Sequence, residues 1–386
     1  MVYQDLQFNY AVLTVLSGLL VSMLIFAVFS KIMHEHGLNM RSAALKRYLS
    51  DIAEIIDAGS DVGFENLLNT YYLKNFKLMN RGKQRSIFEE AILQTINENH
   101  IFAEKAREIA YKFGFADESI INLEHKNLLH KLRGCQQAGA YLYDEAVPLV
   151  LDMLHFINPR IQYNALLALS DFKNPELIAK GFKIIKNAVL VNDRTVREII
   201  EKMGNEQGRL FGMILKTKSP SLIPLFLKFI DKESVIKYLN EIKQFVQSED
   251  MEMRIASVRA LSKTQDKKIL PYIISTLDDD KWEVRAAAAK GISEIRDEKT
   301  YLPILKAMED SAWWVRQNAA MAALSVENPK ILIDNVLRSG DSYAADSLYH
   351  AAELMNMTHL IEEVKERQLP DKTIQSKKIK SGTCYA

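Results

Sequence analysis

A short sequence pattern occurs three times between Met253 and Leu324, and this repeat restricts the chain to few folds. Each copy opens with an apolar residue and an arginine and continues with alanine-rich helix-forming sequence. The pairs are Met253-Arg254, Val284-Arg285 and Val315-Arg316, at an interval of 31 residues. A period of roughly 20–50 residues is typical of solenoids, in which each unit buries its apolar face only against its neighbours. The repeat therefore predicts an array of stacked units.

Both halves of a copy have the period of a helix. In the first half of the middle copy, Val284, Ala288 and Ile292 recur every four residues, which places them on one helical face. Pro303 stands near the start of the second half, where a missing backbone N–H costs little. Strand-like alternation is absent from the sequence. We therefore expect an all-α protein whose unit is helix, turn, helix, turn.

The pattern of Val-Arg, small residues and a following Pro-bearing helix resembles HEAT repeats, and in particular the short type first associated with phycobilisome lyases. This resemblance implies an α-solenoid of HEAT-like antiparallel helix pairs. It also implies a binding platform rather than an enzyme, although a fold alone does not define an activity. The alternative is an enzyme acting in the solenoid groove, either a bilin-type lyase or a protein similar to nucleic-acid glycosylases.

Two aspartates recur together with the arginines. Asp279 and Asp310 each stand six residues before Arg285 and Arg316. Because arginine binds carboxylates through two parallel hydrogen bonds, we expect an Arg-carboxylate ladder that ties adjacent units, and Arg254 belongs to the same series. The expected role of these residues is structural.

Tryptophan also recurs, since Trp282 and Trp313 each stand two residues before the apolar-Arg pair. Trp314 occupies the place that Glu283 holds in the previous copy. A large aromatic residue where the sister unit carries a charge is expected to be exposed, and exposed aromatic residues are enriched at binding hot spots. We therefore predict that Trp314, Trp313 and Arg316 bind a partner. Packing within the turn between units is the alternative for the tryptophans.

Residues 11–29 form an uncharged apolar run of nineteen residues. At about 1.5 Å per residue, a helix of this length matches the hydrocarbon core of a bilayer. The sequence therefore predicts one N-terminal transmembrane helix. A cleaved signal peptide is the rival interpretation, but Asp5 and the lack of a basic residue before the run disfavour it.

The basic residues Lys31, Arg41, Lys46 and Arg47 follow this run, and none precedes it. The positive-inside rule then predicts a single-pass membrane protein with its N-terminus outside and its C-terminal domain cytoplasmic. Cys135 is too far from the second cysteine for a disulfide framework, which agrees with an intracellular domain. An extracytoplasmic domain is the alternative.

The expected divisions follow from these features. They are a short N-terminal tail (1–10), the transmembrane helix (11–29), a juxtamembrane helix and N-terminal capping region (30–130), the HEAT-like solenoid (131–366) and a disordered basic tail (367–386). Within the capping region, residues 81–85 are expected to be a basic loop between helices. Repeat boundaries between residues 170 and 250 stay open, because the pattern there is degenerate.

We expect no catalytic, cofactor-binding or metal site. The sequence holds no phosphate loop or metal motif, and residues 34–36, His-Glu-His, diverge on a helix. His125 and His130, five residues apart, are also not expected to share a helical face. A formal charge of +1 gives no reason to expect nucleic acid, and no small-molecule substrate is expected.

Together these features predict a membrane-anchored scaffold for protein-protein interactions. Its HEAT-repeat solenoid binds or regulates a membrane-associated protein partner, while the N-terminal helix contacts the lipid bilayer. The resemblance suggests partners such as a membrane glycosyltransferase or other envelope machinery.

Overall fold

The computed structural model describes residues 2–79, 82–185 and 192–368, with the side chains of residues 2–21 and 76–79 left outside the description. The described residues are helical, with no strand among them, which confirms the all-α prediction. Compactness divides the chain into two units, Met1–Phe156 and Ile157–Ala386. The predicted start of the solenoid at residue 131 stays a prediction.

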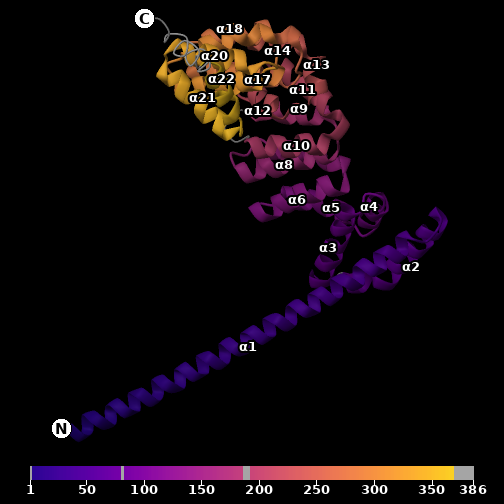
Figure 1. Ribbon diagram of the computed structural model, residues 1–386. Coiled ribbons are helices and arrows are strands. Elements are labelled where there is room, and N and C mark those ends of the chain that lie inside the picture. Colours follow the sequence, from indigo (N-terminus) through magenta and orange to yellow (C-terminus); the bar gives the residue numbers. More distant parts are fainter. Residues whose placement is uncertain (1, 80–81, 186–191, 369–386) are drawn as a thin grey trace, which may run out of the picture. The chain divides into compact units, whose positions relative to one another are not determined.

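The first unit is built from seven α-helices in its described part (Figure 1). They are α1 (Val2–Ile56), α2 (Asp61–Met79), α3 (Gly82–Glu98), α4 (Ala103–Lys112), α5 (Phe115–Glu124), α6 (Leu128–Tyr141) and α7 (Val147–Met153).

Helix α1 is continuous from Val2 to Ile56, and among its described side chains those of its last turns join the core of the first unit. Tyr48, Ile52 and Ile56 are buried there. No helix is long and apolar enough to cross a membrane over the part of the chain searched, which comprises the described residues alone. Residues 11–21 of the expected span have no described side chains.

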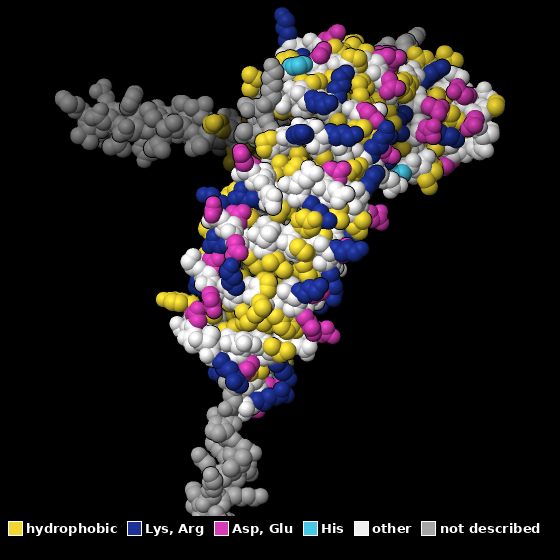
Figure 2. Space-filling model, turned by 90° about the horizontal axis from the view of Figure 1, so that it is seen from above, with side chains coloured by type: hydrophobic (Ala, Val, Ile, Leu, Met, Phe, Trp, Pro, Cys, Tyr) yellow, Lys and Arg dark blue, Asp and Glu magenta, His cyan; other side chains and the backbone are white. Residues whose placement is uncertain are grey.

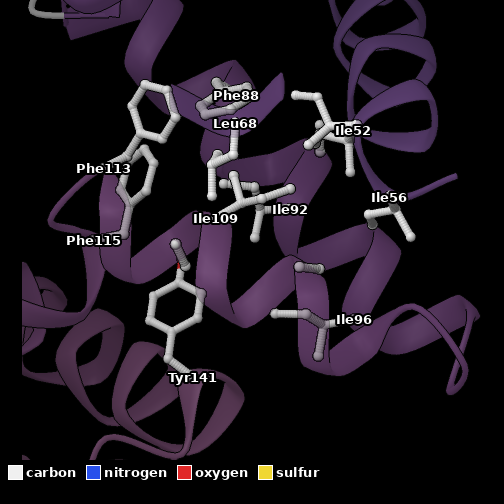
Figure 3. Close-up of a cluster of buried hydrophobic side chains, with 14 of the residues drawn as sticks. Ile52, Ile56, Leu68, Phe88, Ile92, Ile96, Ile109, Phe113, Phe115 and Tyr141 are labelled. Carbon is white, nitrogen blue, oxygen red and sulfur yellow. The ribbon is translucent and has the colours of Figure 1, made fainter. Parts of the chain in front are cut away.

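Aromatic and branched side chains from α1 to α6 form the core of the first unit (Figure 3). The Phe88 ring meets the Phe113 ring edge to face, with centroids 4.9 Å apart. Helices α5 and α6 approach closely because position 134 is glycine. A methyl group there would come within 2.8 Å of the backbone nitrogen of Leu123, a contact that side-chain rotation cannot relieve.

The prediction of a basic loop at residues 81–85 is wrong over its described part, because Gly82 to Arg85 form the first turn of α3. Arg85 donates a hydrogen bond of 2.9 Å to the carbonyl oxygen of Phe113 and pairs with Glu118. Its guanidinium also covers the Phe115 ring at 4.2 Å. Tertiary partners therefore order this basic segment. Arg81 lies outside the described residues.

The second unit continues with helix after helix (Figure 1). The helices are α8 (Pro159–Asp171), α9 (Pro175–Ile184), α10 (Asp193–Met203), α11 (Gln207–Lys216), α12 (Leu222–Phe229), α13 (Lys232–Lys237), α14 (Leu239–Phe245), α15 (Met251–Ser262), α16 (Leu270–Ser275), α17 (Trp282–Ile295), α18 (Tyr301–Met308), α19 (Trp313–Ser325), α20 (Pro329–Ser339), α21 (Ser342–Leu354) and α22 (Thr358–Gln368).

These helices pack in the order expected of repeated pairs. The first helices of successive pairs contact one another in the series α8, α10, α12, α15, α17, α19, α21. Each also contacts a helix of the second series, which includes α9, α11, α14, α16, α18, α20 and α22. Each internal repeat between α8 and α22 thus buries its apolar face against the repeats before and after it. The arrangement agrees with an α-solenoid.

Small side chains let the first helices of the repeats approach each other. All four alanines from Ala286 to Ala289 on α17 are buried. Gly291 on the same helix leaves room for Ser262 of α15, since a methyl group at position 291 would overlap the hydroxyl oxygen of Ser262. The alanine-rich pattern of the sequence is therefore the surface on which neighbouring units pack.

Candidate interaction site at the repeat edge

The N-termini of α15, α17 and α19 carry the repeated arginines at one fixed position. The residues that cap these helices are Asp250, Lys281 and Ala312, and each arginine stands four residues later. At this place Nη1 of Arg285 donates hydrogen bonds to the carbonyl oxygens of Asp279 and Asp280, at 2.8 and 3.3 Å. The arginine is thereby fixed to the turn that precedes its own helix.

The other edge of each guanidinium reaches the following unit. Nε and Nη2 of Arg254 donate to the two carboxylate oxygens of Asp279, at 2.7 and 2.9 Å. Arg285 binds Asp310 in the same way, at 2.6 and 2.9 Å. Each aspartate therefore pairs with the arginine 25 residues before it, in the preceding unit. We call these residues the Arg-Asp ladder.

The ladder shifts the pKa values of its acids and bases. Burial acts to raise the pKa of Asp310, but the hydrogen bonds from Arg285 and from the backbone N–H of Ala312 prevail and lower it. The pKa of Asp279 is lowered by the same balance of burial and hydrogen bonds. The hydrogen bond to Asp310 raises the pKa of Arg285. Both pairs are therefore ionised at neutral pH, with side chains only 12–16% exposed.

Arg316 is the last arginine of the series, and no aspartate among the described residues pairs with its side chain. Its Nη1 donates to the carbonyl oxygens of Asp310 and Ser311, at 2.8 and 3.0 Å, as its sisters do in their own units. Its Nε is buried without a hydrogen-bond partner among the described residues. Both amide atoms of the next residue, Gln317, are likewise buried without a described partner. Such buried polar groups are rare and mark positions that need an explanation.

Helices α17, α19 and α21 carry exposed aromatic side chains, one of which, Tyr343, lies over the Arg316 guanidinium, and we call this set the aromatic edge: Trp282, Trp313, Trp314, Tyr343 and His350. The rings of Trp313 and Trp314 meet edge to face at 4.7 Å, and Trp313 lies 5.8 Å from the ring of His350 on α21. Trp314 is 57% exposed and Tyr343 is 68% exposed. The aromatic edge thus presents large apolar surfaces to solvent beside a cation.

Trp314 and Tyr343 hold the same position in successive helices, two residues after the capping residue. The two preceding units have Glu252 and Glu283 at this position. The edge of the array therefore changes from acidic to aromatic at the unit where the Arg-Asp ladder ends. The predicted binding residues Trp313, Trp314 and Arg316 all belong to the start of α19, where this change falls, and their role in binding stays a prediction.

Sequence reasoning missed a buried polar cluster in the first unit. Glu89, 4% exposed, accepts hydrogen bonds from Arg133 and from Gln137, whose side chain in turn binds Asn122 at 2.8 Å. Asn122 contacts His130 at 2.8 Å. The residues lie on α3, α5 and α6, so no local spacing reveals them. The cluster satisfies its polar groups internally, which gives it a structural explanation.

The expectation that His125 and His130 do not meet is wrong. Their ring centroids are 4.0 Å apart. His125 is the residue that ends α5 and His130 belongs to α6, so the two are not on one helix and helical spacing does not apply. Among the residues that the structure describes, no group of three or more metal-binding side chains comes together. Cys135 on α6 is buried, and burial raises the pKa of its thiol to about 12.

Charged side chains of both signs are mixed over the face of the molecule in Figure 2, with hydrophobic side chains between them. A cavity of about 570 Å³ lies in the second unit between α11, α14 and the start of α15. Its walls combine apolar residues such as Leu215, Phe245 and Met253 with Lys216 and Glu241. Nothing in its lining singles out a ligand, so the aromatic edge remains the better-defined candidate site.

Comparison with known proteins supports the repeat assignment. A family model described as HEAT repeats matches residues 239–330. No curated protein matches the chain. The chain has structural likeness to human deoxyhypusine hydroxylase in complex with glycerol, at 10% identity and a TM-score of 0.27, covering 83% of this chain and 98% of that one. A second likeness is to the CpcE and CpcF complex of phycocyanin lyase from Nostoc sp. PCC7120, at 16% identity and a TM-score of 0.22, covering 64% and 94%.

The matched segment contains the Arg-Asp ladder and most of the aromatic edge. Residues 239–330 therefore contain HEAT-like repeats, which confirms for this segment the resemblance seen in the sequence. The two solved structures are too distant to carry an argument about activity.

Proposed function

We propose that this HEAT-like protein is a membrane-anchored scaffold that holds a protein partner through its aromatic edge. The observation that carries the proposal is the replacement of Glu252 and Glu283 by Trp314 and Tyr343 at equivalent, exposed positions. Solvent exposure of large aromatic side chains is unfavourable in a monomer, and clusters of them mark interaction sites. The proposal gives the repeats a binding role rather than a catalytic one.

The apolar run at residues 11–29 supports attachment to a membrane, with the repeats on the cytoplasmic side. Attachment would confine the repeats to the membrane surface and raise the local concentration of membrane-associated partners. A glycosyltransferase or another component of the envelope machinery fits this role. This part of the proposal rests on the sequence.

Replacing Trp314 by alanine is expected to weaken partner capture by about 30-fold or more while leaving the fold intact, because a central aromatic hot spot contributes about 2 kcal/mol or more. Its exposed side chain makes little contribution to the core. The measurement is the yield of partner crosslinked to the full chain and purified from detergent-solubilised membranes. Leu302→Ala, which removes a 79% exposed apolar side chain on α18, is the control. Equal yields from wild type and Trp314→Ala exclude Trp314 from the interface.

Charges placed in the apolar run are expected to release the chain from membranes. The double substitution Leu19→Arg and Leu20→Arg adds about 2.5–3.5 kcal/mol per residue to the cost of insertion. We expect the full chain in the carbonate-resistant membrane pellet and the double variant in the supernatant. Leu38→Arg, outside the run and on an exposed face, is the matched control and is expected to stay in the pellet. An unchanged distribution of the double variant argues against a membrane anchor.

A further inference from the structure

The residue two positions before each capping residue decides how the Arg-Asp ladder is built. At the starts of α15, α17, α19 and α21 these residues are Ser248, Asp279, Asp310 and Ser339. Each accepts a hydrogen bond from the backbone N–H of its capping residue, at 3.2, 2.9, 2.8 and 3.2 Å in that order. Of these four residues, only the aspartates have a second side-chain oxygen that can accept a hydrogen bond from the arginine of the preceding unit. The ladder is thus bounded by a serine at both ends.

At the C-terminal end, Ser339 holds the position relative to its capping residue that Asp279 and Asp310 hold in the sister units. The Ser339 hydroxyl accepts from the N–H of Asp341 and donates to the carbonyl oxygen of Val336 at 2.8 Å. Asp341 stands 25 residues after Arg316, the interval of the two formed pairs, but it is the capping residue of α21. Its carboxylate accepts from the backbone N–H groups of Tyr343 and Ala344. No carboxylate among the described residues reaches Arg316.

The Nε side of the Arg316 guanidinium, which has no hydrogen-bond partner among the described residues, is held in a defined orientation. The Nη1 bonds to its own turn hold the guanidinium as they do in Arg254 and Arg285. The paired aspartates of the sister units keep 12% of their side chains exposed, so the equivalent place beside Arg316 borders the surface. The Tyr343 ring lies over the guanidinium, with its centroid 5.4 Å from Cζ of Arg316. Because Tyr343 is 68% exposed, it can turn aside without disturbing the core.

We propose that an aspartate or glutamate of the protein partner completes the Arg-Asp ladder at Arg316, with apolar neighbours of that acid packed on Trp314 and Tyr343. This inference rests on the proposed binding function and names the chemistry of the partner segment: acidic at the centre and apolar on both sides. Trp314 and Tyr343 stand where the two preceding units have glutamate, so this part of the edge lacks the negative charge that would repel an acidic segment. Arginine with two free N–H groups selects a carboxylate over an amide.

The test uses two pools of short fluorescent peptides and the full chain in detergent. Both pools have Leu or Phe on each side of a fixed central residue and Gly or Ser elsewhere, and the central residue is aspartate in one pool and asparagine in the other. We expect the aspartate pool to bind at least about 10-fold more tightly, the effect of one charged hydrogen-bonded pair. Arg316→Gln should abolish the difference. Arg259→Gln, which removes an exposed arginine of α15, should retain it.

A second variant tests the same site by placing the carboxylate on this chain itself. Ser339→Asp places a carboxylate at the position of Asp279 and Asp310, where it should bind Arg316 as those residues bind Arg254 and Arg285. We expect this variant to melt at a higher temperature than wild type and to lose the aspartate preference. Retained preference in Ser339→Asp, equal binding of the two pools to wild type, or no measurable binding of the aspartate pool overturns the proposal.

These outcomes are separable from failure of the proposed function. If the pools bind equally but Trp314→Ala still loses the membrane partner, the scaffold function stands and the carboxylate inference falls. If Trp314→Ala retains the partner, the proposed interface itself is wrong. Asp371, outside the described residues, is a competing occupant from the same chain. A rise of about 10-fold or more in affinity for the aspartate pool in Asp371→Asn would assign the site to that residue and overturn an external partner.

Discussion

Ala288→Asp is expected to unfold the repeats of the second unit. Ala288 is fully buried on α17, which packs against both α15 and α19. An aspartate there must either bury a charge without a partner or take up a proton at neutral pH, and its extra atoms have no space. We expect a loss of about 4 kcal/mol or more, which is comparable to the whole stability of many domains. The measurement is thermal unfolding followed by circular dichroism.

Lys290→Asp is the matched control, because it puts the same side chain on the exposed face of the same helix. It should change the free energy of unfolding by no more than about 1 kcal/mol. A melting curve of Ala288→Asp that coincides with wild type would show that this face of α17 is not buried between units.

Asp310→Asn is expected to destabilise the second unit by about 2 kcal/mol, because it removes the charge that Arg285 binds through two hydrogen bonds. The melting temperature should fall by about 4–8 °C for a unit of this size. Asp278→Asn, at the neighbouring surface pair with Lys306, is the control, since both of its side chains are about two-thirds exposed. It should cost less than about 1 kcal/mol.

The same pair predicts how stability depends on pH. The pKa of Asp310 is lower in the folded than in the unfolded chain, so folding favours its ionised form. This contribution is complete above the unfolded pKa of about 3.9 and disappears as pH falls through the lower folded pKa. Wild type should therefore lose stability between about pH 5 and 2 more steeply than Asp310→Asn. Parallel losses would show that the Arg285 pair contributes nothing to folding.

Where the repeat is regular, the local sequence pattern was sufficient to predict which face of each helix is buried. Val284, Ala288 and Ile292 are buried as their spacing predicts. Residues four apart lie on one face of a helix, and that apolar face packs against the neighbouring helices. Between residues 170 and 250 the pattern failed to place the units. The described residues there form helices in the same succession of pairs, from α9 to α14, but without an arginine at the diagnostic position.

The missed contacts have a common physical reason. Glu89 and Arg133 are 44 residues apart, and no period links them. His125 and His130 meet because a helix boundary falls between them. Spacing arguments assume that a helix continues, so they fail wherever the chain turns.

The sequence by itself determined the helical repeat, its Arg and Asp residues and its tryptophans, because a fixed period forces equivalent residues onto equivalent faces. It also contains an aspartate, Asp341, one full period after Asp310. Only the tertiary structure decided that this residue caps α21, so that Ser339 holds the position that Asp279 and Asp310 hold in their own units. The last interval between capping residues is two residues shorter than the others, and a two-residue shift at a helix start changes which side chain faces the preceding unit.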